Sequence, residues 1–424
     1  SNMHKIIFYV FMIFLFFVSN VTFSQLTTPF SSLNSIGELN DNSFANNLAM
    51  GGLGISNGSY WHLNNQNPAA LTSNRFTIFE MGISSDVRQI INETSKDING
   101  NGNINYIGFG VPLIKGGKWI TSIGFNPYST VSYNLINQKR IDQSSALAFY
   151  EYSGTGGLTE AYWANGFRLG NELSLGVKGS YIFGKITNTT SAFVSNESQF
   201  NSTYFEESVY NDYSLNIGIF YKKELVESKF LKIGMVYDLK SSLNANRFTQ
   251  LERRIPGSTS PVVLDTLIDN EISTFNIPRS YGIGISYEII DKLSFGFEFK
   301  VQPWNDKSGF ADNLSIHYKN SFQLSSGIEI IPEAENVNSY FKRVTYRSGI
   351  VYKSFPYLVN GGSINSIGLT FGFSLPVGSI SRINLAFELG RRGNLSKTLI
   401  KERYLKFIIG SSINNIWFIK RKFD

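Results

Sequence analysis

The chain has 424 residues, of which 15% are aromatic, 17% are charged and 38 are glycines, and its mean hydropathy is −0.09. Soluble chains carry about a quarter charged residues, and beyond the first twenty residues no apolar run approaches the roughly 18 residues that a membrane helix needs. These values exclude a disordered chain, a collagen-like repeat and a helical membrane bundle, and they are typical of an outer-membrane β-barrel.

The absence of cysteine and the diffuse charge exclude further classes of site. Without cysteine the chain has no disulfide framework, thiolate metal site, cysteine nucleophile or lipoprotein anchor. The formal net charge of +6 is spread over the whole length, and no basic cluster exceeds Lys420-Arg421-Lys422. We therefore expect no nucleic-acid partner.

Residues 1–24 are predicted to be a secretory signal peptide. Lys5 provides the basic end, residues 6–18 are apolar, and Thr22 and Ser24 are the small residues expected before a cleavage site. The alternative is an N-terminal membrane anchor, for which the apolar stretch is short. Export is the expected outcome.

Residues 25–74 are rich in Asn, Ser, Gly and Leu and show no convincing strand pattern. Their length and their place before the first strand predict a hatch that folds into the lumen of the barrel. Glycine permits positive φ and close contact with a wall, and an Asn-Pro step makes a rigid turn. The alternative is a linker of ordinary loop-forming residues. The candidate hatch or ligand residues are Gly51, Gly52, Gly54, Asn67, Pro68 and Ala69.

Residues 75–424 alternate between apolar and polar residues with a period of two, which indicates β-strands. A soluble sandwich also alternates, but here the polar face carries charges such as Lys178, Lys232, Asp238 and Glu298. Unpaired charges cannot line the dry space between two packed sheets, whereas they can line a wet or plugged lumen. The alternation therefore favours a membrane barrel whose large apolar side chains face lipid.

The alternating segments give fourteen strands, joined by connections that are in turn mostly short and mostly long. The predicted fold is all-β: a transmembrane antiparallel β-barrel of about 14 strands, with both termini periplasmic. Side chains alone cannot fill so wide a barrel, which again favours a hatch. The predicted strands are residues 75–91, 103–114, 118–136, 157–170, 173–192, 209–222, 229–247, 276–289, 292–303, 314–331, 341–356, 364–377, 381–391 and 400–415.

The third predicted strand contains Gly124, Phe125, Asn126 and Pro127. Proline cannot donate to a ladder, so within a closed barrel it marks a bulge or an interrupted pair. From these residues alone, a local bulge above the membrane plane is one interpretation.

Other motifs give little evidence of a metal site or of catalysis. Asp97, Asn99 and Asn101 stand at alternate positions before Gly102, as in the first half of a calcium loop, but the twelfth position is Gly108 instead of Glu. An ordinary polar outer loop is the alternative. No zinc, dinucleotide or nucleophile motif is present, so we expect no cofactor and no enzyme.

The Gly-Gly segment of residues 47–55, followed by Asn67-Pro68-Ala69 ahead of the first strand, resembles the FadL/TodX family of outer-membrane transporters for hydrophobic compounds. It is similar, too, to the PorV-like barrels of that family that serve type IX secretion. The resemblance covers the hatch motif, the strand count and the overall length. Because the third strand of FadL barrels is kinked and opens the wall, it implies a lateral opening at residues 124–127.

The resemblance implies passive uptake of hydrophobic small molecules through the outer membrane of a Gram-negative bacterium, with lateral exit at the third strand. The alternative is a non-transporting accessory or plug barrel of a type IX secretion complex. The expected partners are outer-membrane lipid and lipopolysaccharide, a hydrophobic ligand and, under the alternative, secretion-machinery proteins.

Overall fold

The computed structural model describes residues 28–41, 43–141, 146–194, 201–255, 261–304, 309–310, 318–359, 361–378 and 380–416. The predicted signal peptide and the C-terminal basic cluster lie outside these residues. No helix in the described ranges is long and apolar enough to cross a membrane.

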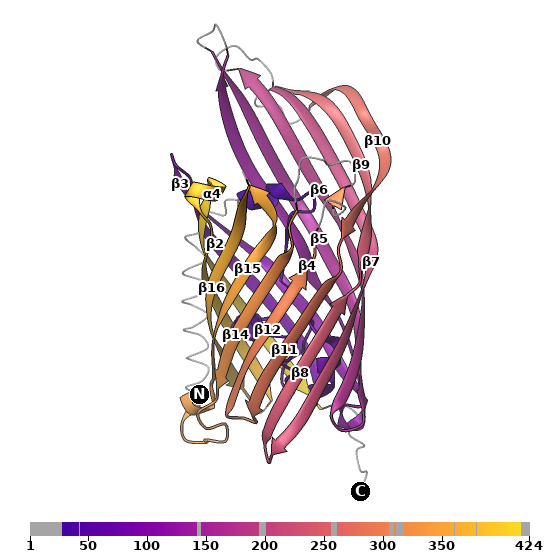
Figure 1. Ribbon diagram of the computed structural model, residues 1–424, viewed down its shortest axis with the longest axis vertical. Coiled ribbons are helices and arrows are strands. Elements are labelled where there is room, and N and C mark those ends of the chain that lie inside the picture. The colour runs from indigo at the N-terminus through magenta and orange to yellow at the C-terminus, as the bar shows by residue number, and fades with distance from the viewer. Residues whose placement is uncertain are drawn as a thin grey trace.

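A closed antiparallel barrel of 14 strands forms the wall, with extra short strands (Figure 1). Consecutive strands pair with each other, and the last strand, β18 (Lys401–Asn415), pairs with the first, β2 (Thr77–Ile91). Two wall strands are interrupted, so that β8 (Lys229–Asp238) continues as β9 (Ser241–Arg254) and β10 (Val262–Ile277) continues as β11 (Ser280–Ile289). The predicted fourteen-stranded barrel is confirmed.

The remaining elements complete the wall and its connections. The other wall strands are β3 (Lys96–Ile114), β4 (Trp119–Arg140), β5 (Leu147–Leu169), β6 (Leu173–Val194), β7 (Asn201–Val226), β12 (Leu293–Gln302), β14 (Ser321–Ile330), β15 (Thr345–Val359), β16 (Gly362–Val377) and β17 (Ser381–Gly393). Short connecting elements are η3 (Lys115–Gly117), β13 (Gly309–Phe310), α3 (Tyr340–Arg343) and α4 (Leu395–Thr398). The ends of β4, β5, β6, β7, β9 and β10 rise beyond the rest of the wall (Figure 1).

The alternating sequence places apolar side chains outside the barrel and small or polar ones inside it. In β12, Phe295 and Phe297 face outward and are 50% and 49% exposed, whereas the next residue, Glu298, faces the lumen and is only 4% exposed. A soluble sandwich would bury these phenylalanines, so that alternative is excluded. The exposed apolar surface belongs to the transmembrane barrel, where lipid covers it.

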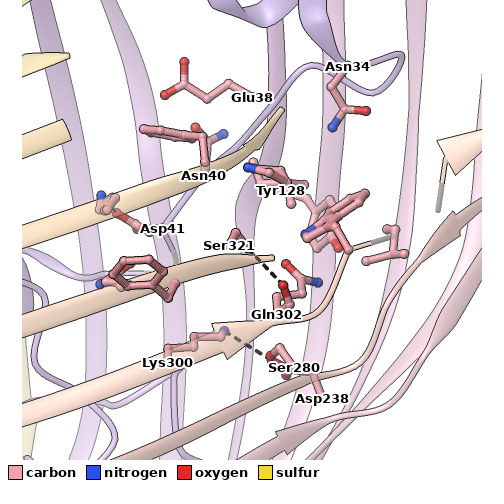
Figure 2. A pocket seen from close by; sticks show the side chains of 18 of the residues that line it. Asn34, Glu38, Asn40, Asp41, Tyr128, Asp238, Ser280, Lys300, Gln302 and Ser321 are labelled. Atoms are coloured by element: carbon pink, nitrogen blue, oxygen red, sulfur yellow. Dashed lines mark hydrogen bonds and ion pairs between the residues drawn. The ribbon is translucent and has the colours of Figure 1, made fainter. Parts of the chain in front are cut away.

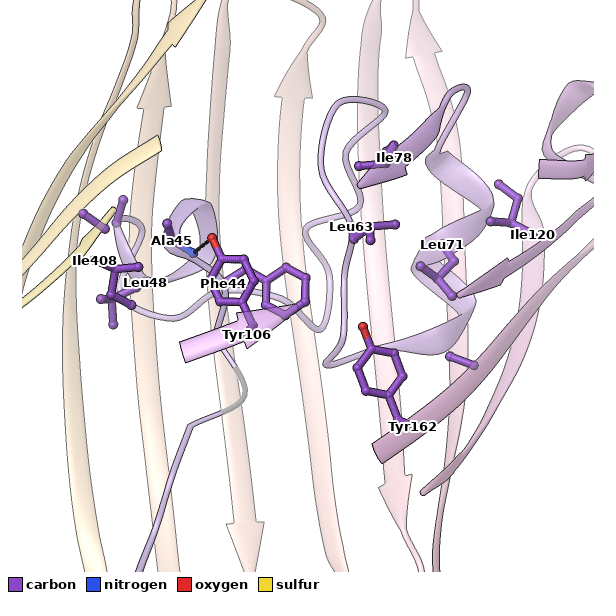
Figure 3. Packing of buried hydrophobic residues seen from close by; sticks show 13 residues of the cluster. Phe44, Ala45, Leu48, Leu63, Leu71, Ile78, Tyr106, Ile120, Tyr162 and Ile408 are labelled. Atoms are coloured by element: carbon purple, nitrogen blue, oxygen red, sulfur yellow. Dashed lines mark hydrogen bonds between the residues drawn. The ribbon is translucent and has the colours of Figure 1, made fainter. Parts of the chain in front are cut away.

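Residues 28–41 and 43–74, called here the N-terminal segment, lie in the lumen that the wall encloses (Figure 1). The segment contains η1 (Pro29–Leu33), β1 (Glu38–Leu39), α2 (Ala45–Leu48) and η2 (Pro68–Ser73). Phe44 stacks on Tyr106 of β3 with ring centroids 4.1 Å apart, and Leu63 and Leu71 join the same buried cluster (Figure 3). The apolar core of the protein therefore lies between this segment and the inner face of the wall.

Strand β3 corrects the prediction of an outer loop at residues 92–102, because it begins at Lys96. Asp97, Asn99 and Asn101 therefore lie in a strand. At about 3.3 Å per residue, Asp97 and Asn101 are some 13 Å apart, too far to converge on one ion as loop residues do. No group of three or more His, Asp or Glu residues in the described ranges could hold a metal.

Candidate functional site: an opening in the wall and a charged chamber

The ladder between β3 and β4 is short. It runs from Ile114 opposite Trp119 to Ile107 opposite Phe125, and there it ends. Beyond this point β3 continues to pair with β2, and β4 continues to pair with β5 as far as Arg140. The wall thus lacks pairing between these two strands from Asn126 onward.

The local sequence explains why the ladder ends there. Pro127 has no N–H to donate, and the pairing of β4 with β5 shifts register between Pro127 and Ser129. Asn126 is turned into the lumen, where its Nδ2 donates to Oε2 of Glu160 at 2.8 Å and its Oδ1 accepts from Asn65 at 2.9 Å. Both residues therefore favour separation of β4 from β3.

The N-terminal segment covers part of the edge of β4 that is no longer paired with β3. The backbone N–H of Thr28 donates to the carbonyl of Ser132 at 2.6 Å, and that of Asn40 donates to Tyr128 at 2.9 Å. Between these bonds β1 pairs antiparallel with β4, with Glu38 opposite Thr130. The segment therefore acts as a short added strand on the inner side of the opening.

A cavity of about 630 Å³ lies at this opening. The β3 side contributes residues 101–107, including three asparagines, and the β4 side contributes residues 125–127 and Thr130. A second cavity of about 300 Å³, called here the chamber, lies farther inside the barrel (Figure 2). The two cavities are neighbours and share five lining residues: Glu38, Asn40, Asp86, Arg88 and Lys406.

Charged side chains from several strands line the chamber, beside apolar and aromatic ones such as Leu215, Ile277 and Trp304. On the wall, Lys178 pairs with Glu160 at 3.1 Å, and Lys300 pairs with Asp238 at 3.2 Å (Figure 2). The charged lining residues from the wall are the acidic Asp86, Glu160, Asp238 and Glu388 and the basic Arg88, Lys178, Lys300, Lys353, Arg392 and Lys406. The N-terminal segment adds two carboxylates, Glu38 and Asp41, which balance these charges.

Glu38 and Asp41 join the N-terminal segment to distant strands. Arg392 of β17 pairs with Glu38 and, at 2.7 Å, with the buried Glu402 of β18. Arg88 of β2 lies 3.6 Å from Glu38. Burial raises the pKa of Glu38, but Arg392 and Arg88 outweigh burial and lower it to about 2.

Asp41 is held in a similar way by lysines. It pairs with Lys353 of β15, and Lys406 and Lys300 add to the positive potential around its carboxylate. Burial opposes ionisation, but together the three lysines lower the pKa of Asp41 below its ordinary value. Both carboxylates are therefore ionised at neutral pH.

The predicted hatch glycines hold the N-terminal segment against β12 and β14–β16, on the other side of the barrel from the opening. Gly51 has a φ of +72° and donates its N–H to Oγ1 of Thr370 at 2.8 Å. Gly52 has a φ of +85°, and Gly54 donates to the carboxylate of Glu298 at 3.0 Å. A side chain at Gly51 would collide with the carbonyls of β14 and β15, so glycine is needed there.

Asn67, Pro68 and Ala69 start η2 against β6 and β7. Oδ1 of Asn67 accepts from the N–H of Ala69 at 3.0 Å, which caps η2, and its Nδ2 donates to the carbonyl of Ile219 at 3.1 Å. A Cβ at Gly218 of β7 would overlap this Asn67 side chain. None of the six candidate hatch residues lines the chamber or the opening, so in the structure they position the segment.

A family model for BamG matches residues 3–424. The chain belongs to the BamG family. Among solved structures, the toluene transporter TodX of Pseudomonas putida aligns with a TM-score of 0.58 at 15% identity, covering 89% of this chain and 100% of that chain. The toluene transporter TbuX of Ralstonia pickettii gives 0.57 at 15% identity and covers 88% of this chain and 99% of that chain.

The CymD monoaromatic hydrocarbon channel aligns at 0.54 with 13% identity, covering 90% of this chain and 99% of that chain. At these identities the likeness shows the fold, and it confirms the predicted resemblance of this BamG-family chain to FadL/TodX barrels. All three are described as channels or transporters. A search of curated proteins by sequence found no match.

The sequence indicated the residues at the opening of this BamG-family barrel and two inward charges of the chamber, Lys178 and Asp238, but not the chamber as a site. Phe125, Asn126 and Pro127 line the opening, and Gly124 forms the pair before the last one of the ladder. The two ion pairs that join the N-terminal segment to the wall, Glu38–Arg392 and Asp41–Lys353, link residues more than 300 positions apart. The only sequence signal of the chamber is the inward position of charges such as Asp86 and Arg88 in the two-residue alternation.

Proposed function

We propose that this chain passes hydrophobic small molecules through an outer membrane by diffusion, and that they leave sideways between β3 and β4. In this proposal residues 1–24 are a signal peptide, residues 25–74 are a hatch, and residues 75–424 form the barrel with both termini periplasmic. Its surroundings are outer-membrane lipid and lipopolysaccharide.

The interrupted β3–β4 ladder carries the proposal. Backbone groups at membrane depth need a partner or water, so an unpaired edge is tolerated where it lines a water-filled cavity or is covered by protein. The 630 Å³ cavity at this edge shares five lining residues with the chamber, which supports a route between lumen and bilayer. The described functions of TodX and TbuX support the same class of cargo.

Narrowing the opening tests this route. A Cβ at Gly102 would meet only the carbonyl of Ser84 at 3.7 Å, so Gly102→Trp places bulk at the opening without a collision. We expect it to reduce, about tenfold, the rate at which intact cells take up the hydrophobic dye N-phenylnaphthylamine, because the route is obstructed. Gly179→Trp on β6 is the control, since nothing lies within 4 Å of its Cβ and it lines neither cavity. Equal uptake by both variants would contradict lateral exit.

The charge network favours a second candidate, an accessory or plug barrel of a secretion complex such as type IX. Ion pairs of Glu38 and Asp41 fasten the N-terminal segment across the lumen, as a plug requires. Affinity purification from membranes distinguishes the two. Stoichiometric recovery of secretion components, together with no dye uptake by the wild type, would favour the accessory role.

A further inference from the structure

The chamber is amphiphilic, because apolar side chains such as Leu215, Ile277 and Trp304 share its lining with charged ones. Ten charged wall residues line it together with Glu38 and Asp41, and a hydrocarbon would displace water from them without replacing its hydrogen bonds. We propose that the chamber and the opening bind the phosphate headgroup of a membrane lipid, whose acyl chains stay in the bilayer. This inference rests on the proposed lateral opening and names the ligand class for it.

The net charge of the lining does not select an anion, because Glu38 and Asp41 bring its acidic residues to the same number as its basic ones, so an anionic headgroup depends on a cation that keeps donors free. Among the lining residues of the wall, six are basic and four are acidic. Glu402, just behind the lining, neutralises part of Arg392, and the carboxylates of Glu38 and Asp41 occupy the remaining positive potential. A phosphate, like a carboxylate, accepts charge-assisted hydrogen bonds from Lys and Arg, so it can bind where a cation keeps donors free.

Lys406 is the cation best placed to receive the headgroup. It lies on the inward face of β18, opposite Asp86 of β2 and Glu388 of β17, and it lines both cavities. Within the described ranges it forms no ion pair shorter than 4 Å, unlike Lys178, Lys300 and Lys353. Its ammonium group therefore keeps donors for a ligand at the junction of the two cavities.

The opening presents the graded polarity that an amphiphile needs. At its outer side Ile104 and Phe125 are 61% and 54% exposed and can contact acyl chains. Farther in, the cavity is lined by Asn101, Asn103 and Asn105, whose amides can donate to ester and phosphate oxygens. The cations of the chamber follow. This order matches a lipid that enters headgroup first.

Native mass spectrometry of the purified full chain in detergent tests the proposal. The probes are dioleoyl phosphatidic acid, diolein with the same chains but no phosphate, and inorganic phosphate. We expect the wild type to bind phosphatidic acid about tenfold more tightly than diolein, as one or two charge-assisted bonds provide. Inorganic phosphate should bind more weakly than the lipid, because it gains nothing from the apolar part of the opening.

Three variants show where the lipid binds. Lys406→Gln should weaken phosphatidic acid binding about tenfold, and Lys406→Arg should restore it, because the charge is kept. Lys401→Gln, on the outward face of the same strand, should leave it unchanged. Retained mobility of the unheated protein in SDS gels shows that each variant is folded.

Three outcomes would overturn the inference. Equal binding of phosphatidic acid and diolein would mean that the headgroup is not recognised. Inorganic phosphate as tight as the lipid would assign the site to a free anion. Equal loss in Lys406→Gln and Lys401→Gln would mean non-specific attraction. Because binding is measured without passage, failure here is separate from failure of Gly102→Trp to reduce dye uptake.

Discussion

The two ladders on either side of the β2–β3 hairpin are unequal. The ladder between β18 and β2 joins the two ends of the barrel through 15 residue pairs without a register shift. The ladder between β3 and β4 joins consecutive strands across a short turn, yet it ends after 7 pairs. Closeness in sequence therefore does not determine how far two strands pair. The extent of pairing depends instead on whether each residue has a backbone N–H to donate and on which side chains are turned into the lumen.

The inner faces of the two ladders differ in the same sense. Behind the closed ladder, Ser412 donates to Glu80 at 2.6 Å and contacts His62 of the N-terminal segment at 2.9 Å, and all three side chains are buried. Behind the β3–β4 ladder lie the chamber and the neighbouring cavity, with a short added strand in place of side-chain packing. The β18–β2 side is a structural joint, whereas the β3–β4 side is where we propose exchange with the bilayer.

A proline in the β18–β2 ladder should have the largest effect on folding of the barrel. Phe407 of β18 pairs with Phe387 on one side and Ser85 on the other. We expect Phe407→Pro to prevent closure of the barrel, because an unpaired backbone group in lipid costs several kcal/mol. Loss of the faster-migrating unheated form in SDS gels measures this. The matched change Leu135→Pro lies where β4 pairs with β5 alone, and it should still fold. Equal loss in both would show that the two ladders do not differ in importance.

Breaking the contact of the N-terminal segment with the closed side should have the next largest effect. Glu38→Gln leaves Arg392 and Arg88 without one of their anions, and removal of one partner of a buried pair costs about 3–5 kcal/mol. Because Glu402 still pairs with Arg392, the lower end of that range applies. Urea unfolding and limited proteolysis of residues 28–41 measure the loss.

The control for this variant is the exposed pair of Lys342 and Glu333, 2.6 Å apart. Lys342→Gln should cost less than about 1 kcal/mol, since solvent screens such pairs. Acid gives an independent check. The folded pKa of Glu38 is about 2, below its ordinary 4.5, so its contribution is complete above pH 4.5 and is lost as the pH falls toward 2. Protease resistance of the segment that stays constant from pH 6 to 2 would contradict the role of this carboxylate.

The wall could be predicted from sequence because each strand carries its own evidence. The alternation in Leu293–Lys300 gives both the strand and its lipid-facing side, and Pro127 alone marks the interrupted pair. The start of β3 could not be predicted. Residues 96–103 have few apolar side chains, so their sequence resembles that of a polar loop. The chamber could not be predicted either, because Glu38 meets Arg392 only after the barrel has closed.

The smallest effect on stability, and the sharpest test of why the ladders differ, is expected from Pro127→Val. Valine restores a donor and favours strands, so stability should change by less than about 1 kcal/mol. If Pro127 is what ends the β3–β4 ladder, the backbone amides of residues 103–106 should exchange more slowly with deuterium than in the wild type. Unchanged exchange would instead assign the interruption to residues 28–40, whose bonds to Tyr128 and Ser132 already occupy the edge of β4. In that case Pro127→Val combined with Glu38→Gln, which loosens the segment, should slow the exchange where neither change alone does.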